Sequence, residues 1–109
     1  MMETLAQALN STGYPFAHFG WASDAIERKR DHGVYAEDGG KNFTGDGHQT
    51  ERTTIGTVDF FTRDDSETPR NTIEAALNGL ECCAWYLNSV QFEEDTGFIH
   101  LEWVFEVVG

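Results

Sequence analysis

The residues of this sequence most able to do chemistry lie in the stretch FFTRDDSETPRNTIEAALNGL, which begins at residue 60. It contains the acids Asp64, Asp65, Glu67 and Glu74, with Ser66 among them. Clustered carboxylates can bind a metal ion or act as a catalytic pair. The calcium-loop pattern D-x-[DN]-x-[DN]-G is absent, however. A surface turn also does not desolvate one carboxylate while solvating its neighbour, as acid–base catalysis requires.

The same stretch has the features of a turn that leads into a helix. Thr68 and Pro69 precede an apolar set at helical spacing: Ile73, Ala76, Leu77 and Leu80. A hydroxyl at the N-cap, followed by proline in the first turn, is typical of a helix start. Asp and Ser residues form turns through bonds to their own backbone, and acids suit the positive end of the helix dipole. We therefore interpret the acidic cluster as a helix start.

No other residues form a catalytic pattern. The histidines at 18, 32, 48 and 100 are scattered without HExxH spacing, and G-x-S-x-G is absent. Cys82 and Cys83 are adjacent, which suits neither an ordinary disulfide nor a zinc site and indicates two half-buried apolar residues in a reducing compartment. His100 is expected at the surface or an interface. We predict that the protein is not an enzyme and has no cofactor and no metal site.

The composition restricts the possible partners. The 109 residues are enough for one domain, and 19 acids against 7 bases give a net charge of −12. Without a basic patch, binding to nucleic acids or anionic membranes is not expected. The N-terminal MMETLAQALN resembles neither a signal peptide nor an anchor. The aromatic content of 13% predicts either rings that bury against another chain or an aromatic-rich core.

Apolar periodicity and turn residues predict the order of the elements. We expect helices over residues 2–10 and 69–80, and strands over 16–21, 33–36, 49–62, 82–92 and 98–108, with a hairpin turn at 95–97. Residues 22–31 fit a helical turn or a polar connection. The glycine-rich segment at about 37–48 is expected to be a mobile loop or hairpin tip without the spacing of a phosphate loop. The fold class is α+β: a largely antiparallel sheet of about four or five strands, with two helices packed on one face.

The last strand gives the clearest pattern. One face carries only apolar side chains: Ile99, Leu101, Trp103, Phe105 and Val107. The other face mixes apolar residues with charged ones: Phe98, His100, Glu102, Val104, Glu106 and Val108. Such alternation indicates a half-buried strand whose mixed face meets a neighbour. The predicted subunit-interface residues are Trp21, Phe43, Phe98, Val104 and Val108.

Several segments resemble a known family. The segments VDFFT, RDDSETPRNTIEAALNG and CAWYLNSVQFEEDTGFIHLEWVFEV are similar to the C-terminal half of small tail-completion proteins of long-tailed bacteriophages and prophages. The opening ETLAQALNSTGYPFAHFGW is similar to the family's short helix, Gly-x-Pro turn and aromatic strand. The resemblance covers nearly the whole chain and is strongest over 57–108. It is weakest over 22–36, where Asp31-His32-Gly33 replaces a frequent proline.

The resemblance implies a single tail-terminator-like domain over residues 1–109. In such proteins an α+β subunit forms a ring, commonly a hexamer, that caps the tail tube, stops its polymerisation and joins the tail to the head–neck complex. The implied partners are other copies of the chain, the tail tube protein and a stopper or connector protein. The implied place is the virion neck, after assembly in the host cytoplasm.

The strong acidity would suit a ring through which genomic DNA passes without sticking. Two alternatives stay open. One is another structural protein of the neck or tail tube. The other is a monomeric acidic phage inhibitor or adaptor that mimics the charge of nucleic acid and acts on a host protein.

Overall fold

The structure is a computed structural model that describes residues 2–19, 30–42, 52–81 and 83–108. In chain order the elements are α1 (Met2–Asn10), β1 (Phe16–His18), β2 (His32–Asn42), β3 (Arg52–Thr62), α2 (Thr68–Asn78), β4 (Cys83–Phe92) and β5 (Ile99–Val108). The strands form one five-stranded sheet in the order β1-β2-β3-β5-β4. Among the pairs of these described strands, β1–β2 alone is parallel. This is the α+β fold with a largely antiparallel sheet that the sequence predicts.

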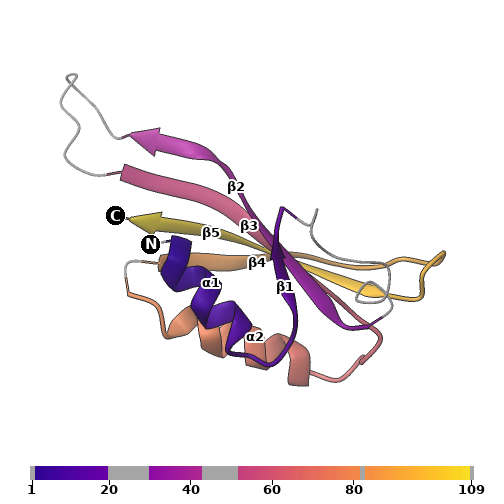
Figure 1. Cartoon of the computed structure of the whole chain (residues 1–109). Helices are drawn as coiled ribbons and strands as arrows, with labels where there is room; N and C mark the ends of the chain where they lie inside the picture. Colours follow the sequence, from indigo (N-terminus) through magenta and orange to yellow (C-terminus); the bar gives the residue numbers. More distant parts are fainter. Residues whose placement is uncertain (1, 20–29, 43–51, 82, 109) are drawn as a thin grey trace.

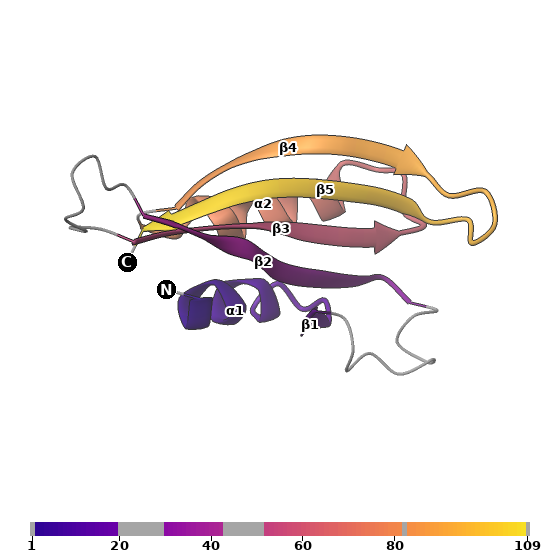
Figure 2. The same ribbon diagram turned by 90° about the horizontal axis from the view of Figure 1, so that it is seen from above.

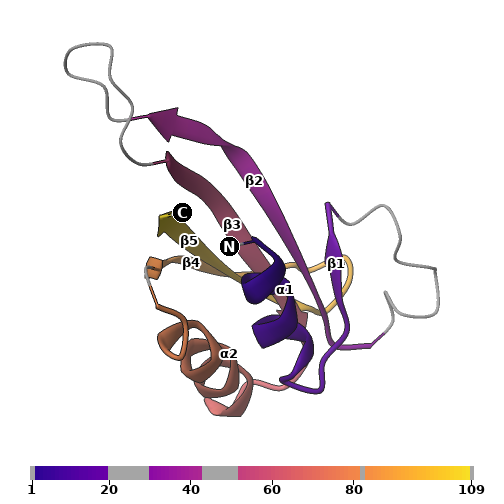
Figure 3. The same ribbon diagram turned by 60° about the vertical axis from the view of Figure 1, so that its left-hand side comes forward.

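Both helices lie on the same side of the sheet (Figures 1 and 3). Leu5 and Leu9 of α1, and Ile73 and Leu77 of α2, are fully buried at the i and i+4 spacing that places side chains on one helix face. They pack against the apolar face of the sheet: Val58, Phe60, Leu101, Trp103, Phe105 and Val107. No helix in the described part of the chain is long and apolar enough to cross a membrane.

The start of α2 differs in detail from the prediction. Asp64 Oδ1 accepts a bond from the Ser66 amide at 2.8 Å, and Ser66 Oγ accepts one from the Thr68 amide at 3.3 Å, so this acid does form a turn. The N-cap is Glu67 rather than Thr68, and no side chain caps the helix. Thr68 is already the first helical residue, and its amide donates to Ser66 of the preceding turn. Its carbonyl then accepts a bond from the Thr72 hydroxyl at 2.8 Å.

Glu74 stabilises the packing between α2 and the sheet. Its Oε2 accepts hydrogen bonds from Trp103 Nε1 and Arg70 Nε, both at 3.0 Å. Trp103 has no exposed surface, so its indole N–H needs an acceptor inside the protein. The sequence interpretation gave Glu74 only a role at the helix dipole. That role is wrong, because no acid lies in the first turn of α2; the Glu74 side chain instead satisfies a core donor.

Residues 37–42 belong to β2, which pairs antiparallel with β3, so the mobile loop is wrong for them and the hairpin is the closer of the two predictions. This part of β2 pairs with β3 after a bulge between Glu37 and Gly39, and Asn42 lies opposite Arg52. The strand forms because β3 supplies a continuous ladder of backbone partners, which local composition does not reveal. Residues 43–48 of the predicted loop lie outside the described residues.

The other strands match the prediction closely. β1 ends at His18, before Phe19 turns the chain with a φ of 62°, so it is shorter than the expected 16–21. The β4–β5 hairpin closes as predicted. Gly97 takes a φ of 78°, and its amide donates to the Glu93 carbonyl at 2.8 Å. In β5 the residues predicted to be apolar and buried do face the helices.

Candidate functional site

The face of the sheet turned away from the helices, here called the open face, is the main candidate surface. Strand alternation and the pairing registers place the following residues on it: His32, Val34, Ala36, Ile55, Thr57, Asp59, Phe61, Ala84, Tyr86, His100, Glu102, Val104 and Glu106. Figure 2 looks onto this face, with α2 behind β3 and β5. No described helix covers it. The open face is therefore where a partner can approach the sheet.

One end of the open face is apolar. A hollow of about 360 Å³ lies over β3, β5 and β4, and Ile55, Ala84, Tyr86 and Val104 line it together with Glu106. We call it the apolar hollow. Tyr86 is 57% exposed there. A second, shallow hollow next to it is lined by Cys83, Ala84, Glu106 and Val108. Contiguous apolar lining of this kind is typical of an interaction surface.

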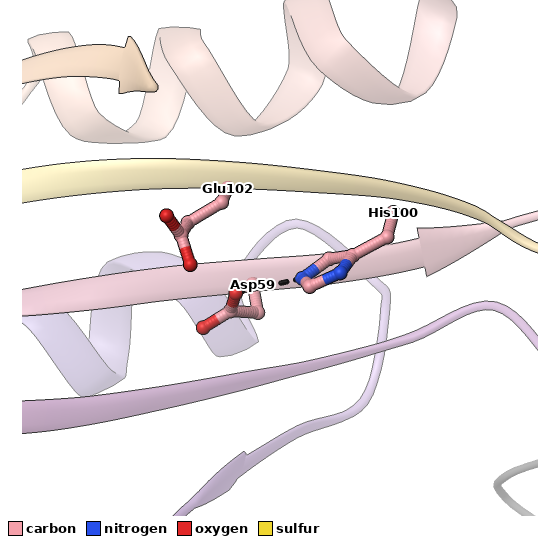
Figure 4. Close-up of side chains that lie close together, drawn as sticks. All are labelled: Asp59, His100 and Glu102. Carbon is pink, nitrogen blue, oxygen red and sulfur yellow. Dashed lines mark hydrogen bonds and ion pairs between the residues drawn. The ribbon is translucent and has the colours of Figure 1, made fainter. Parts of the chain in front are cut away.

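The other part of the open face carries a carboxylate–histidine cluster, formed by Asp59, His100 and Glu102 (Figure 4). Asp59 on β3 lies directly opposite Glu102 on β5. Like charges in directly opposed positions repel each other. His100 offsets this repulsion, because its Nε2 donates to Asp59 Oδ1 at 2.7 Å.

Further hydrogen bonds hold the cluster. The Thr57 hydroxyl donates to Asp59 Oδ2 at 3.1 Å, and Asn88 Nδ2 donates to Glu102 Oε1 at 2.7 Å. The His100 ring also stacks on Phe61, with ring centroids 4.3 Å apart. The hydrogen bond with Asp59 raises the pKa of His100 above its usual value, and partial burial opposes this effect. The charges of Asp59, Glu93 and Glu102 act in the same direction as the hydrogen bond.

Asp59, His100 and Glu102 could in principle hold a divalent cation, since one ligand atom from each lies within 4.8 Å of the others. All three side chains already have protein partners, however, so the cluster is satisfied as a hydrogen-bonded network. It ties β3 to β5 and to Asn88 of β4. Sequence analysis did not find the cluster, because 41 positions separate Asp59 from His100. Only the strand register shows that they are neighbours.

The predicted interface residues fall into three groups. Val104 lines the apolar hollow, and Val108 lines the hollow beside it. Phe98 is only 5% exposed: the Arg63 guanidinium lies 4.0 Å from its ring centroid, and Phe61 packs against its edge. Other residues of the same chain thus cover the Phe98 side chain, which leaves little of it for a subunit contact. Trp21 and Phe43 lie outside the described residues.

The aromatic side chains divide between the core and the surface. Among the described residues, the rings of Phe60, Trp103 and Phe105 are fully buried. Phe19, Tyr86 and Phe92 are exposed. The core therefore accounts for many of the rings, and an exposed remainder lies mainly on β4.

Among the described strands, β4 has β5 as its only neighbour and so forms a free edge of the sheet. Val90 and Phe92 are 54% and 65% exposed there, on the helix side. Val90 also lines a hollow of about 180 Å³ between β4 and the start of α2, here called the edge hollow. The other lining residues are Thr62, Asp64, Asp65, Ser66, Glu67, Pro69, Arg70, Ile99 and Leu101. Asp64, Asp65 and Glu67 of the acidic cluster thus lie beside an apolar depression.

Comparison with known proteins adds little to these observations. No family model matches the sequence, and no curated protein matches it. A crystal structure from Akkermansia muciniphila is 8% identical, with a TM-score of 0.46, and the match covers 97% of this chain and 70% of that chain. A second structure from this organism, described as being without a transmembrane region, is 8% identical with a TM-score of 0.39 and covers 97% and 77%. With TM-scores below 0.5, neither likeness bears on function.

Proposed function

We propose that this chain is a structural subunit of a homo-oligomeric ring in the neck of a long-tailed bacteriophage or prophage. In this role it acts as a tail terminator: it caps the tail tube, stops its polymerisation and joins the tail to the head–neck complex. The resemblance over residues 57–108 supplies the place in the particle. The observation in favour of a ring contact is the apolar hollow on the open face, which includes Val104, one of the predicted interface residues.

Two features make the apolar hollow suitable for a contact between copies. The core already packs both helices against the opposite face, so the apolar side chains of the hollow have no partner among the described helices. A net charge of −12 keeps copies apart in general, so association needs a specific apolar contact that outweighs the repulsion. Tyr86 is the type of aromatic residue that is enriched at protein contacts.

A pair of substitutions tests the ring contact. Val104→Asp places a charge in the apolar hollow, and Phe19→Asp places the same charge at an exposed position after β1, at the other edge of the sheet. Self-association of the purified chain, alone and with tail tubes, is measured by light scattering and electron microscopy. We expect rings from the wild type and from Phe19→Asp, and monomers from Val104→Asp. Circular dichroism controls for folding.

Phe98→Asp is not a suitable probe, because this buried ring contributes to folding. A wild-type chain that stays monomeric even with tail tubes contradicts the proposal and favours the acidic inhibitor or adaptor. Rings that persist in folded Val104→Asp show that the hollow is not the contact. A ring found at another position in the neck or tail tube favours a different structural role in the same particle.

A further inference from the structure

The free edge of β4 has an unusual composition for this chain. Its ten residues, CAWYLNSVQF, contain no charged residue and no proline, although the chain has 19 acids. Exposed edge strands are normally protected by charges, prolines or bulges, because their unpaired backbone groups attract another strand. β4 has one irregularity, between Leu87 and Ser89, and its remaining length is regular. This edge is therefore able to accept a further strand.

The other edge of the sheet is better protected. β1 covers part of β2, pairing with Gly33, Val34 and Tyr35. Beyond that, β2 has a bulge between Glu37 and Gly39 and carries the charged residues Glu37 and Asp38. Within the described part of the sheet, strand addition is thus favoured at β4.

The edge hollow lies where side chains of an added strand would reach. Its floor is apolar and includes Val90, Ile99 and Leu101, and Phe92 is exposed nearby. The acids Asp64, Asp65 and Glu67 stand around it, and all three are exposed. The one base in the lining, Arg70, forms an ion pair with Glu74 at 3.0 Å. An apolar side chain with a lysine or arginine beside it fits such a depression.

The ends of β4 are acidic as well. Glu81 precedes the strand, and Glu93, Glu94 and Asp95 follow it. A second copy paired antiparallel along β4 would bring the acids at 93–95 of one chain near Glu81 of the other. Such like charges repel within the Debye length, about 8 Å at physiological salt. The surroundings of β4 therefore disfavour a second copy and favour a basic partner.

We propose that β4 and the edge hollow bind an extended segment of a partner protein, in which apolar residues alternate with lysine or arginine, as an added strand of the sheet. Backbone hydrogen bonds along β4 supply the affinity, and the edge hollow with its acids supplies the preference for this sequence type. This inference rests on the proposed function for the setting of the partner, a neck or tube protein. It concerns a different surface from the apolar hollow.

The test uses two synthetic ten-residue peptides as probes, one alternating valine with lysine and one alternating valine with glutamate. Each is titrated into the full chain by fluorescence anisotropy, and amide hydrogen exchange is followed along β4. We expect the lysine peptide to bind and to protect β4 amides, and the glutamate peptide not to bind. Val90→Lys should weaken binding about tenfold to a hundredfold, the range expected for losing one buried valine contact.

Phe19→Lys is the matched control. Phe19 is 48% exposed, close to the 54% of Val90, and follows β1 at the other edge of the sheet. The Phe19→Lys substitution adds the same charge far from β4. A general loss of electrostatic attraction for a basic peptide would therefore appear in both variants. Wild-type affinity in Phe19→Lys with weak binding in Val90→Lys supports the proposal.

Three results overturn it: equal effects of the two variants, equal binding of the two peptides, or no protection of β4 by the lysine peptide. Protection of β4 by self-association in the absence of peptide also overturns it, since a second copy would then occupy the edge. Ring formation is measured separately through Val104→Asp. A failed peptide experiment therefore leaves the ring proposal standing, and the reverse holds as well.

Discussion

Gly56→Ala tests the packing of β2 on β3 most directly. Gly56 is buried in β3, between Glu37 of β2 and Phe105 of β5. A Cβ atom added there would lie 2.1 Å from the backbone oxygen of Ala36 and 2.7 Å from Cζ of Phe105. Ordinary carbon contacts are about 3.5–4.0 Å. The added Cβ would therefore clash with the backbone of β2, and the two strands would have to move apart to relieve the clash.

The cost follows from the geometry. Overpacking a core lowers the free energy of unfolding by about 1–3 kcal/mol when side chains can adjust. A clash with the backbone is relieved less easily, so its cost lies at or above the upper limit of this range. We expect Gly56→Ala to lower the free energy of unfolding by about 3 kcal/mol or more. At about 4–8 °C per kcal/mol for a small domain, the melting temperature falls by more than about 10 °C. Urea unfolding and thermal melts followed by circular dichroism measure both values.

Gly79→Ala is the matched control. Gly79 follows α2 with a φ of −75°, and an added Cβ would lie 3.5 Å from the carbonyl oxygen of Ala76. Alanine fits this conformation, so we expect a gain of about 0.4–1 kcal/mol from the smaller entropy of the unfolded chain. Equal stability of Gly56→Ala and the wild type would refute the β2–β3 register described here, including the bulge after Glu37.

Two further predictions concern the open face and its border. Because the folded state raises the pKa of His100, its contribution to stability is fully present below the unfolded-state pKa of about 6.5 and is lost as pH rises through the folded-state pKa. Urea unfolding at several pH values should show this loss, and His100→Gln should flatten it. An unchanged slope in the variant would assign the pH dependence to other groups. Phe98→Ala should lower stability by about 3–5 kcal/mol, whereas Phe92→Ala, at an exposed ring, should change it little. Equal effects of the two alanine variants in thermal melts would contradict the burial of Phe98.

The elements that depend on local sequence were predictable. The alternation of β5 identified its buried face because period two allows only one assignment of inside and outside. The proline and apolar spacing located α2 to within two residues at its end, and the turn at Gly97 located the hairpin. The N-cap was misassigned by one residue because the cap at Glu67 uses no side-chain hydrogen bond, so its side chain gives no capping signal in the sequence.

Features that depend on pairing between distant segments were not predictable. Residues 37–42 contain two glycines and look like a loop, yet β3 holds them in the sheet. The carboxylate–histidine cluster exists only because Asp59 and Glu102 are register partners. Likewise, the acids at 64–67 were correctly assigned to a helix start, but their position beside Val90 requires the packing of α2 against β4 and β5.

The strand order has a consequence for biosynthesis. β5 comes last among the elements in the chain, yet it lies between β3 and β4 and supplies four core side chains: Leu101, Trp103, Phe105 and Val107. A nascent chain that has emerged only as far as Gly97 can form its helices and the β2–β3 pair. The apolar side chains of these elements then lack the core residues that β5 supplies. Cooperative folding must therefore wait for the ribosome to release β5, and until then the exposed apolar surface is a potential target for chaperones.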